Sequence, residues 1–148
     1  MTIADHQPAR GRLTTAAGDP ELDSQLSAEL DTYNFAASGV NDQREFTVKV
    51  EDDEGQLLAG LSGWTWGSCA GIAMVWVREE SRKAGWGGRL LEVAEHVARE
   101  RRCNRMFVSS FTFQAPDFYR RHGYVETARV ENFPIDGAAD VYLVKALH

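Results

Sequence analysis

A glycine-rich turn near the middle of the chain has the composition of an anion-binding site. Gly85, Gly87 and Gly88 lie within four positions, and an amphipathic helix is predicted directly after them. The first amides of a helix have no partners within it, and the helix dipole adds partial positive charge at that end. Glycine leaves room for a phosphate to approach these amides, and Arg82 and Lys83 add formal charge nearby. The turn therefore predicts a phosphate-binding site, with a purely structural turn as the alternative.

Two widespread phosphate-binding motifs do not fit this turn. A Walker loop requires a lysine followed by serine or threonine after its glycines, and none follows Gly88. The dinucleotide fingerprint requires a third glycine at the position of Leu90. The pattern that does fit is Arg-x-x-Gly-x-Gly, formed by Arg82, Gly85 and Gly87.

A second segment, about 30 residues further along, contains a tyrosine that could donate a proton. In FQAPDFYRRHGY, the residues Ala115, Tyr119, Gly123 and Tyr124 form the pattern Ala-x-x-x-Tyr-x-x-x-Gly-aromatic. With these two motifs in this order, the chain resembles the GNAT superfamily of acyl-CoA-dependent N-acetyltransferases over about residues 10–148. The resemblance implies that the protein is an enzyme that uses acetyl-CoA.

The resemblance also implies a fold and a cofactor site. The fold is a single α/β (α+β) domain with a mixed, mostly antiparallel sheet that is splayed at a cofactor cleft, with helices on both faces. Strand 72–77 would pair with the pantetheine arm and polarise the thioester carbonyl through a backbone amide, and the amides of residues 83–88 would hold the pyrophosphate. The implied cofactor-binding residues are Val75, Trp76, Val77, Arg82, Lys83, Ala84, Gly85, Trp86, Gly87, Gly88, Thr112, Gln114, Ala115 and Tyr119.

Two positions within this set need separate comment. The family often has an asparagine three positions before the alanine of the second motif, where this chain has Thr112, and Gln114 is the other polar candidate there. Trp86 lies in the variable position between the glycines, and we expect it to pack under the helix rather than to contact the ligand.

Tyr119 is the predicted catalytic residue, because a phenol held beside the sulfur can protonate the departing thiolate as a general acid. Packing of Tyr119 in the core is the alternative. The attacking amine must itself lose a proton, since an alkyl ammonium has a pKa near 10.4. Strand 70–77 has no acidic residue, so the candidate base is Glu45, with Asp31 and Glu29 as alternatives.

Aromatic residues at the ends of neighbouring elements are candidates for the acceptor site. Trp64 and Trp66 share one face of their strand by alternation, and such rings can stack on a cationic acceptor. Core packing is the alternative for each of them, and His122 is expected to cap a helix. The predicted acceptor-binding residues are Tyr33, Trp64, Trp66 and Phe111.

Periodicity predicts the elements that position these residues. Asp19 and Pro20 are expected to cap and begin the first helix, and the apolar run 70–77 predicts a strand buried on both faces. Helices are predicted over 19–37, 87–101 and 115–123, and strands over 11–17, 44–50, 56–67, 70–77, 105–111, 124–132 and 140–147.

Length and charge limit the class of protein. A chain of 148 residues fits one domain, which we expect over 10–148 after a flexible tail at 1–9. The net charge of −6 argues against a general nucleic-acid binder, and no run is apolar enough for a membrane span or a signal peptide. Cys69 and Cys103 match no metal pattern and are expected as free thiols in a reducing cytoplasm. A homodimer is left open.

The distribution of charge suggests the kind of acceptor. Residues 1–60 contain 4 Lys and Arg against 12 Asp and Glu, whereas residues 61–148 contain 12 against 10. An acidic half is suited to a cationic partner, so the predicted acceptor is a cationic small molecule, such as a metabolite or an amino-bearing antibiotic. The alternatives are a peptide or protein amine, and a non-catalytic module that binds acyl-CoA.

Overall fold

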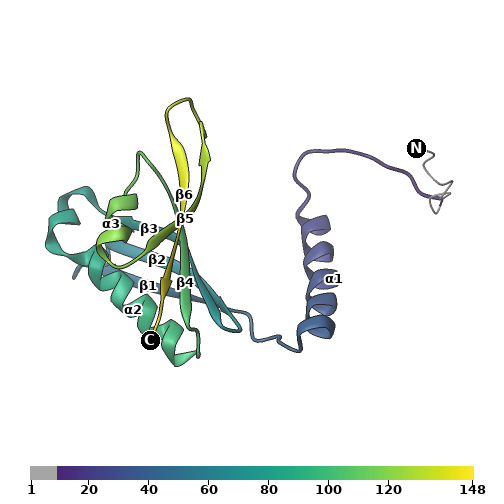
Figure 1. Ribbon diagram of the computed structural model, residues 1–148, viewed down its shortest axis with the longest axis horizontal. Coiled ribbons are helices and arrows are strands. Elements are labelled where there is room, and N and C mark those ends of the chain that lie inside the picture. The colour runs from purple at the N-terminus through teal and green to yellow at the C-terminus, as the bar shows by residue number, and fades with distance from the viewer. Residues whose placement is uncertain (1–9) are drawn as a thin grey trace. The chain divides into compact units, whose positions relative to one another are not determined.

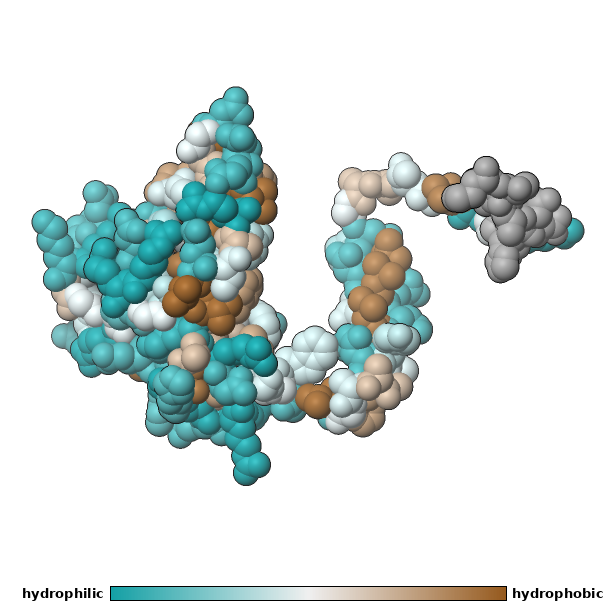
Figure 2. Space-filling model, in the orientation of Figure 1, coloured by the Kyte–Doolittle hydropathy of each residue, from teal (hydrophilic) through white to brown (hydrophobic). Residues whose placement is uncertain are grey.

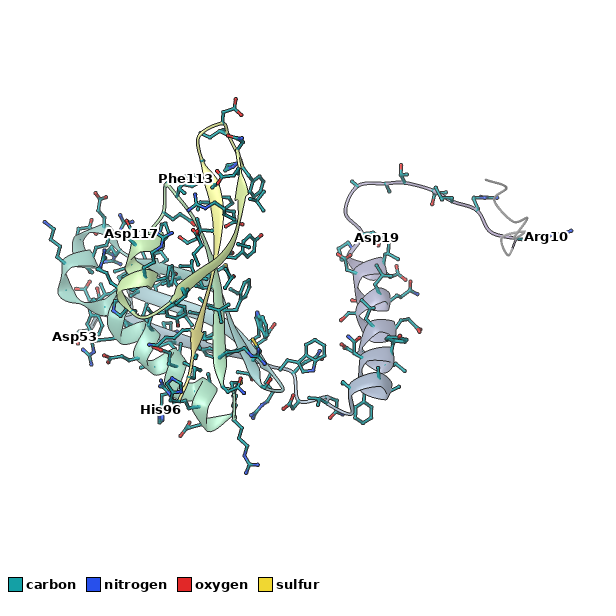
Figure 3. All side chains as sticks on the ribbon, in the orientation of Figure 1. Arg10, Asp19, Asp53, His96, Phe113 and Asp117 are labelled. Carbon is teal, nitrogen blue, oxygen red and sulfur yellow. The ribbon has the colours of Figure 1, made fainter. Side chains whose placement is uncertain are left out.

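The computed structural model describes residues 10–148, which divide into two compact units on either side of Gly39. In the first unit, α1 (Pro20–Ser38) follows Asp19, whose side chain accepts a hydrogen bond of 3.0 Å from the Leu22 amide (Figures 1 and 3). Pro20 occupies the first helical position, and the left-handed Gly39 ends the helix. The predicted helix, its cap and its first residue are therefore confirmed.

The segment before α1 is not the predicted edge strand. Residues 11–17 form no strand, and Leu13, their one large apolar side chain, is 91% exposed. Nothing in this stretch gives a strand an apolar face to bury, which explains the error. The tail predicted at 1–9 lies outside the described residues. Along α1 itself, Leu22, Leu26 and Leu30 are exposed, and Figure 2 shows apolar surface along this helix.

The second unit is built on a mixed, six-stranded sheet with the strand order β1-β2-β3-β4-β6-β5. Neighbouring strands are antiparallel except β3 and β4, which are parallel, so the predicted mixed and mostly antiparallel sheet is confirmed. The elements are β1 (Arg44–Glu51), β2 (Leu57–Trp66), β3 (Cys69–Val77), the 3-10 helix η1 (Glu79–Ala84), α2 (Trp86–Glu100), β4 (Arg105–Phe111), α3 (Pro116–Arg121), β5 (Val125–Glu131) and β6 (Ala139–Ala146).

Both helices of this unit lie on one face of the sheet (Figure 1). The connections from β3 to β4 and from β4 to β5 advance in the same direction along the sheet, and right-handed crossovers then place α2 and α3 on the same side. Apolar residues of α2, including Leu90, Leu91 and Ala94, are fully buried against the strands. A helix on the opposite face stays a prediction.

The sheet is splayed between β3 and β4. These strands pair only through Cys69–Gly71 and Arg105–Phe107, after which they part. The prediction that strand 70–77 is buried on both faces is therefore wrong for its second half, where Met74 is 70% exposed and Trp76 is also exposed. An apolar run indicates a strand but not how far its neighbour accompanies it.

Two further predictions concern the cysteines and membrane-spanning segments. Cys69 and Cys103 are free thiols. Among residues 10–148, no helix combines the length and apolar composition needed to cross a membrane.

Candidate active site

The parting of β3 and β4 opens a cleft with a volume of ≈ 1010 Å³. One wall is β3 from Ile72 to Val77, and the other walls come from β4, α3 and the beginning of α2. Along this part of β3, β2 pairs with one edge of the strand, and β4 no longer pairs with the other. An extended ligand can add to such an edge through main-chain hydrogen bonds, which is how the resemblance described above implies that a pantetheine arm binds.

The glycine turn forms one end of the cleft. Gly85 has a φ of +81°, in the left-handed region that favours glycine, and it ends η1 directly before α2. The Arg89 amide makes the first backbone hydrogen bond of α2, to the Gly85 carbonyl, so the amides before Arg89 have no intrahelical partner. Arg82 also lines the cleft, and its Nε donates to the Val77 carbonyl at 3.1 Å. The cleft thus has backbone donors and a cation at the end of β3.

Gly87 and Gly88 have a second reason to be glycine, which the sequence did not reveal. A Cβ at Gly87 would lie 3.0 Å from the Phe118 ring, and one at Gly88 would lie 3.1 Å from Nε2 of His122. These two glycines therefore allow α3 to pack closely against the first turn of α2. Their predicted role, room for a phosphate, stays a prediction, and both glycines line the cleft.

Tyr119 lies in the cleft with its ring fixed by packing. The side chain is 7% exposed, and its ring makes edge-on contacts with the rings of Phe118 and Tyr124 at centroid distances of 5.2 and 5.7 Å. In the described part of the chain no residue forms a hydrogen bond with its hydroxyl, although the residue lines the cleft. Burial raises the pKa of Tyr119, because it disfavours the charged phenolate. The residue is thus a protonated phenol with an unused donor.

Comparison with known proteins connects this geometry to a family. A family model, described as the acetyltransferase (GNAT) family, matches residues 13–124. The chain belongs to this family. Acetyl-CoA is the acetyl donor of GNAT proteins, and the chain is accordingly an acetyl-CoA-dependent N-acetyltransferase.

Individual relatives agree with this assignment. The chain is 28% identical over 108 residues to acetyltransferase Atu2258 of Agrobacterium fabrum, covering 73% of this chain and 79% of that protein. It is 38% identical over 99 residues to the blasticidin-S acetyltransferase of Streptomyces morookaense, covering 64% of this chain and 70% of that protein. A crystal structure of an acetyltransferase from Bacillus cereus matches with a TM-score of 0.79 at 29% identity, covering 91% of this chain and 98% of that chain.

Most of the predicted cofactor residues of this GNAT protein line the cleft. They are Val75, Trp76, Val77, Arg82, Gly85, Gly87, Gly88, Gln114, Ala115 and Tyr119. Lys83, Ala84 and Trp86 do not line it. Trp86 instead packs against the core, with the Arg89 guanidinium 4.8 Å from its ring centroid, and its expected packing role is confirmed.

The two residues considered in place of the family's asparagine hold the loop between β4 and α3. Thr112 lies outside the main cleft, and its hydroxyl accepts a hydrogen bond of 3.1 Å from the Ala139 amide. Oε1 of Gln114 accepts one of 2.8 Å from the Phe111 amide. Both side-chain oxygens are thus used within the protein, so a cofactor contact through either of them stays a prediction.

The structure separates the predicted acceptor-side residues. Glu45 lies on β1, opposite Trp64 in the register and two strands from β3, and it does not line the cleft with Tyr119. Trp66 lies at the end of β2, and like Glu45 it does not line the cleft. Tyr33 belongs to the first unit, so its relation to the cleft stays a prediction.

Phe111 lies on β4, which borders the splay, whereas Trp64 lies on β2, one strand away, and neither residue lines the cleft. The Trp64 indole covers Gly71, where an added Cβ would lie 2.2 Å from it, and Gly71 is the last residue of β3 paired with β4. Phe111 ends β4 and stacks on Phe113 at 5.2 Å. Phe113, labelled in Figure 3, lies on the loop between β4 and α3 and lines the cleft.

Phe118 was missed as a site residue from the sequence, and His122 was expected mainly as a helix cap, a position that it does occupy at the end of α3. Both line the cleft beside Tyr119, and Nδ1 of His122 lies 2.8 Å from the Phe118 carbonyl oxygen, so the ring is fixed against α3. Arg121 and Ser109 also line the cleft. The helical period of 115–123 could have placed Phe118 and His122 on one face, since they are four residues apart.

Proposed function

We propose that this chain transfers an acetyl group from acetyl-CoA to the primary amine of a small cationic molecule, by direct attack in a ternary complex. The observation that carries the proposal is the buried phenol of Tyr119, which lines the cleft between the open edge of β3 and the first turn of α2 and whose hydroxyl has no hydrogen-bond partner among residues 10–148. Tyr119 is the general acid that protonates the departing thiolate. Its raised pKa keeps the proton available at neutral pH.

The residues of the cleft fit acetyl-CoA, which supplies the acetyl group as an activated thioester. The free edge of β3 from Ile72 onwards offers backbone donors and acceptors to the extended arm. The unpaired amides that begin α2, together with Arg82, would hold the pyrophosphate. A backbone amide on the free edge of β3 would polarise the thioester carbonyl.

Charge and exposed rings support a cationic acceptor. The first 60 residues are strongly acidic, and Trp64, Trp76 and Phe113 are exposed around the splay. Aromatic faces attract cations within about 6 Å, and more strongly where water is excluded. The relative from Streptomyces morookaense is named for acetylating blasticidin S, which adds an amino-bearing antibiotic to the acceptors worth testing.

An assay of thiol release from acetyl-CoA tests the proposal. Wild-type protein is mixed with acetyl-CoA and, separately, with blasticidin S, spermidine, an aminoglycoside and a peptide with a free N-terminus. Acceptor-dependent release with at least one of the three cationic small molecules supports the proposal. Release with the peptide alone would show that the acceptor is a peptide amine and not a small cationic molecule. If the protein binds acetyl-CoA but no acceptor causes thiol release, the protein is a non-catalytic module that binds acyl-CoA.

A further inference from the structure

The structure contains a buried carboxylate that neither the sequence motifs nor the cofactor cleft explains. Asp140 is the second residue of β6, opposite Phe111 on β4 and Val130 on β5. Its partner Phe111 lies at the end of β4 where β3 and β4 have already parted. The carboxylate is therefore attached to the splayed end of the sheet.

The register places Asp140 on the face that α2 and α3 do not cover. On β4, Val108 and Ser110 are buried beneath the helices, so alternation directs Ser109 and Phe111 to the other face. Tyr142 pairs with Ser109 as Asp140 pairs with Phe111, and the four residues thus share that face. Since Ser109 lines the cleft, Asp140 is a diagonal cross-strand neighbour of a cleft residue.

Within the described residues, the Asp140 carboxylate is partnered by the neutral phenol of Tyr142 and by no cation. The residue is 8% exposed, and its Oδ1 is buried without any hydrogen bond. No lysine, arginine or histidine within residues 10–148 forms an ion pair with it. An unpaired buried carboxylate opposes folding. For comparison, Glu95 on the helix side is equally buried but is paired with Lys145.

Two neighbours of Asp140 on this face, Phe111 and Tyr142, have neutral aromatic side chains. The negative charge of Asp140, together with a side-chain hydrogen bond between the two residues, raises the pKa of the Tyr142 phenol, and the Tyr142 ring stacks on Phe107 at 5.9 Å. Phe111 stacks on Phe113 and makes a tilted ring contact with Phe133, each at a centroid distance of 5.2 Å. A single negative charge among rings, with no cation of its own, is the arrangement that recognises an ammonium group.

We propose that Asp140 is the anionic anchor for a cationic group of the acceptor, with the ring of Phe111 beside it. The inference rests on the proposed function and adds the residue that selects a charged acceptor. The bound cation supplies the missing partner of Oδ1, so the unpaired charge is relieved only in the complex. Phe113 and Phe133, which are both exposed, move aside to admit it.

The test compares Asp140→Asn with Asp136→Asn, a control in the exposed turn of the same β5–β6 hairpin. Blasticidin S and spermidine are the acceptor probes, and KM is measured for each probe and for acetyl-CoA, with the melting temperature of each variant. We expect Asp140→Asn to raise the acceptor KM at least tenfold, to change the acetyl-CoA KM less than twofold, and to leave the melting temperature unchanged or higher. Asp136→Asn should change none of these values.

Three outcomes would overturn the inference, and they can be told apart. An unchanged acceptor KM in Asp140→Asn would refute the anchor while leaving the proposed function intact. A fall of several degrees in the melting temperature would show that the carboxylate is structural. Failure of the wild-type protein to acetylate either cationic probe would overturn the proposed cationic acceptor, and the anchor with it.

Discussion

At the scale of single residues, the cleft depends on what burial does to Tyr119. The ring is held by Phe118 and Tyr124, and no hydrogen bond to the hydroxyl is formed by any residue in the described part of the chain. Tyr119→Phe keeps these ring contacts and removes only the proton donor. We expect kcat to fall at least tenfold, within the usual range for loss of a general acid, and the KM for acetyl-CoA to change less than threefold. Steady-state thiol release measures both values. An unchanged kcat would show that Tyr119 only packs in the core and is not the general acid.

The same residue makes a prediction about pH. Tyr119 donates while it is protonated, and burial raises its pKa above the ordinary value of 10, so its contribution is lost only above that value. The ratio of wild-type kcat to Tyr119→Phe kcat should therefore stay constant between pH 7 and about pH 10. Taking the ratio cancels the titration of all other groups. A ratio that declines with a midpoint well below pH 10 would contradict the assignment.

At the scale of elements, the position of Tyr119 depends on how closely α3 approaches α2. Because a Cβ at Gly87 would lie 3.0 Å from Phe118, Gly87→Ala should push α3 outward. Overpacking of this kind costs about 1–3 kcal/mol, and the shift should also lower kcat. Urea denaturation and thiol release measure the two effects.

Two further variants separate this contact from backbone strain. Phe118→Leu removes the ring that the new methyl group meets, so the double variant with Gly87→Ala should recover part of the stability that the alanine alone loses. Gly85→Ala is the matched control, because Gly85 has a positive φ but no atom within 4 Å of its added Cβ. It should destabilise through the backbone, and Phe118→Leu should give no recovery. Recovery in both pairs would refute the contact.

The elements themselves were largely predictable, whereas their contacts were not. The cap at Asp19, the period of α2 and the two motifs are local patterns, and the structure has the predicted elements at those places. The strand predicted at 11–17 does not form, because strand propensity alone does not provide a neighbouring strand to pair with. The exposure of Met74 depends on where the pairing of β3 with β4 ends. The absence of a side chain at position 87 is required by the ring of Phe118, which lies far along the chain from Gly87. Asp140 was missed because no motif includes it.

At the scale of the whole molecule, the splay that forms the cleft also weakens the sheet. β3 and β4 share only three paired positions, so the helix side adds a second connection between the strands β1–β3 and β4–β6. There α2 contacts β1 through β4, and Glu95 of α2 forms an ion pair with Lys145 of β6. A ligand that adds to the free edge of β3 and also contacts α2 and α3 bridges the same gap. Cofactor binding should therefore stabilise the fold as a whole.

The size of this effect can be predicted by linkage. A ligand that binds only the folded state stabilises it by about 2.7 kcal/mol at 100 times its Kd, and each kcal/mol raises the melting temperature of a chain of this size by about 2–4 °C. We therefore expect saturating acetyl-CoA to raise the melting temperature by roughly 5–10 °C. Pantetheine, which lacks the pyrophosphate, should give a much smaller shift, because it leaves the amides of α2 and Arg82 unused. Equal shifts would place the phosphate away from the glycine turn, and no shift at millimolar acetyl-CoA would contradict the cleft as the cofactor site.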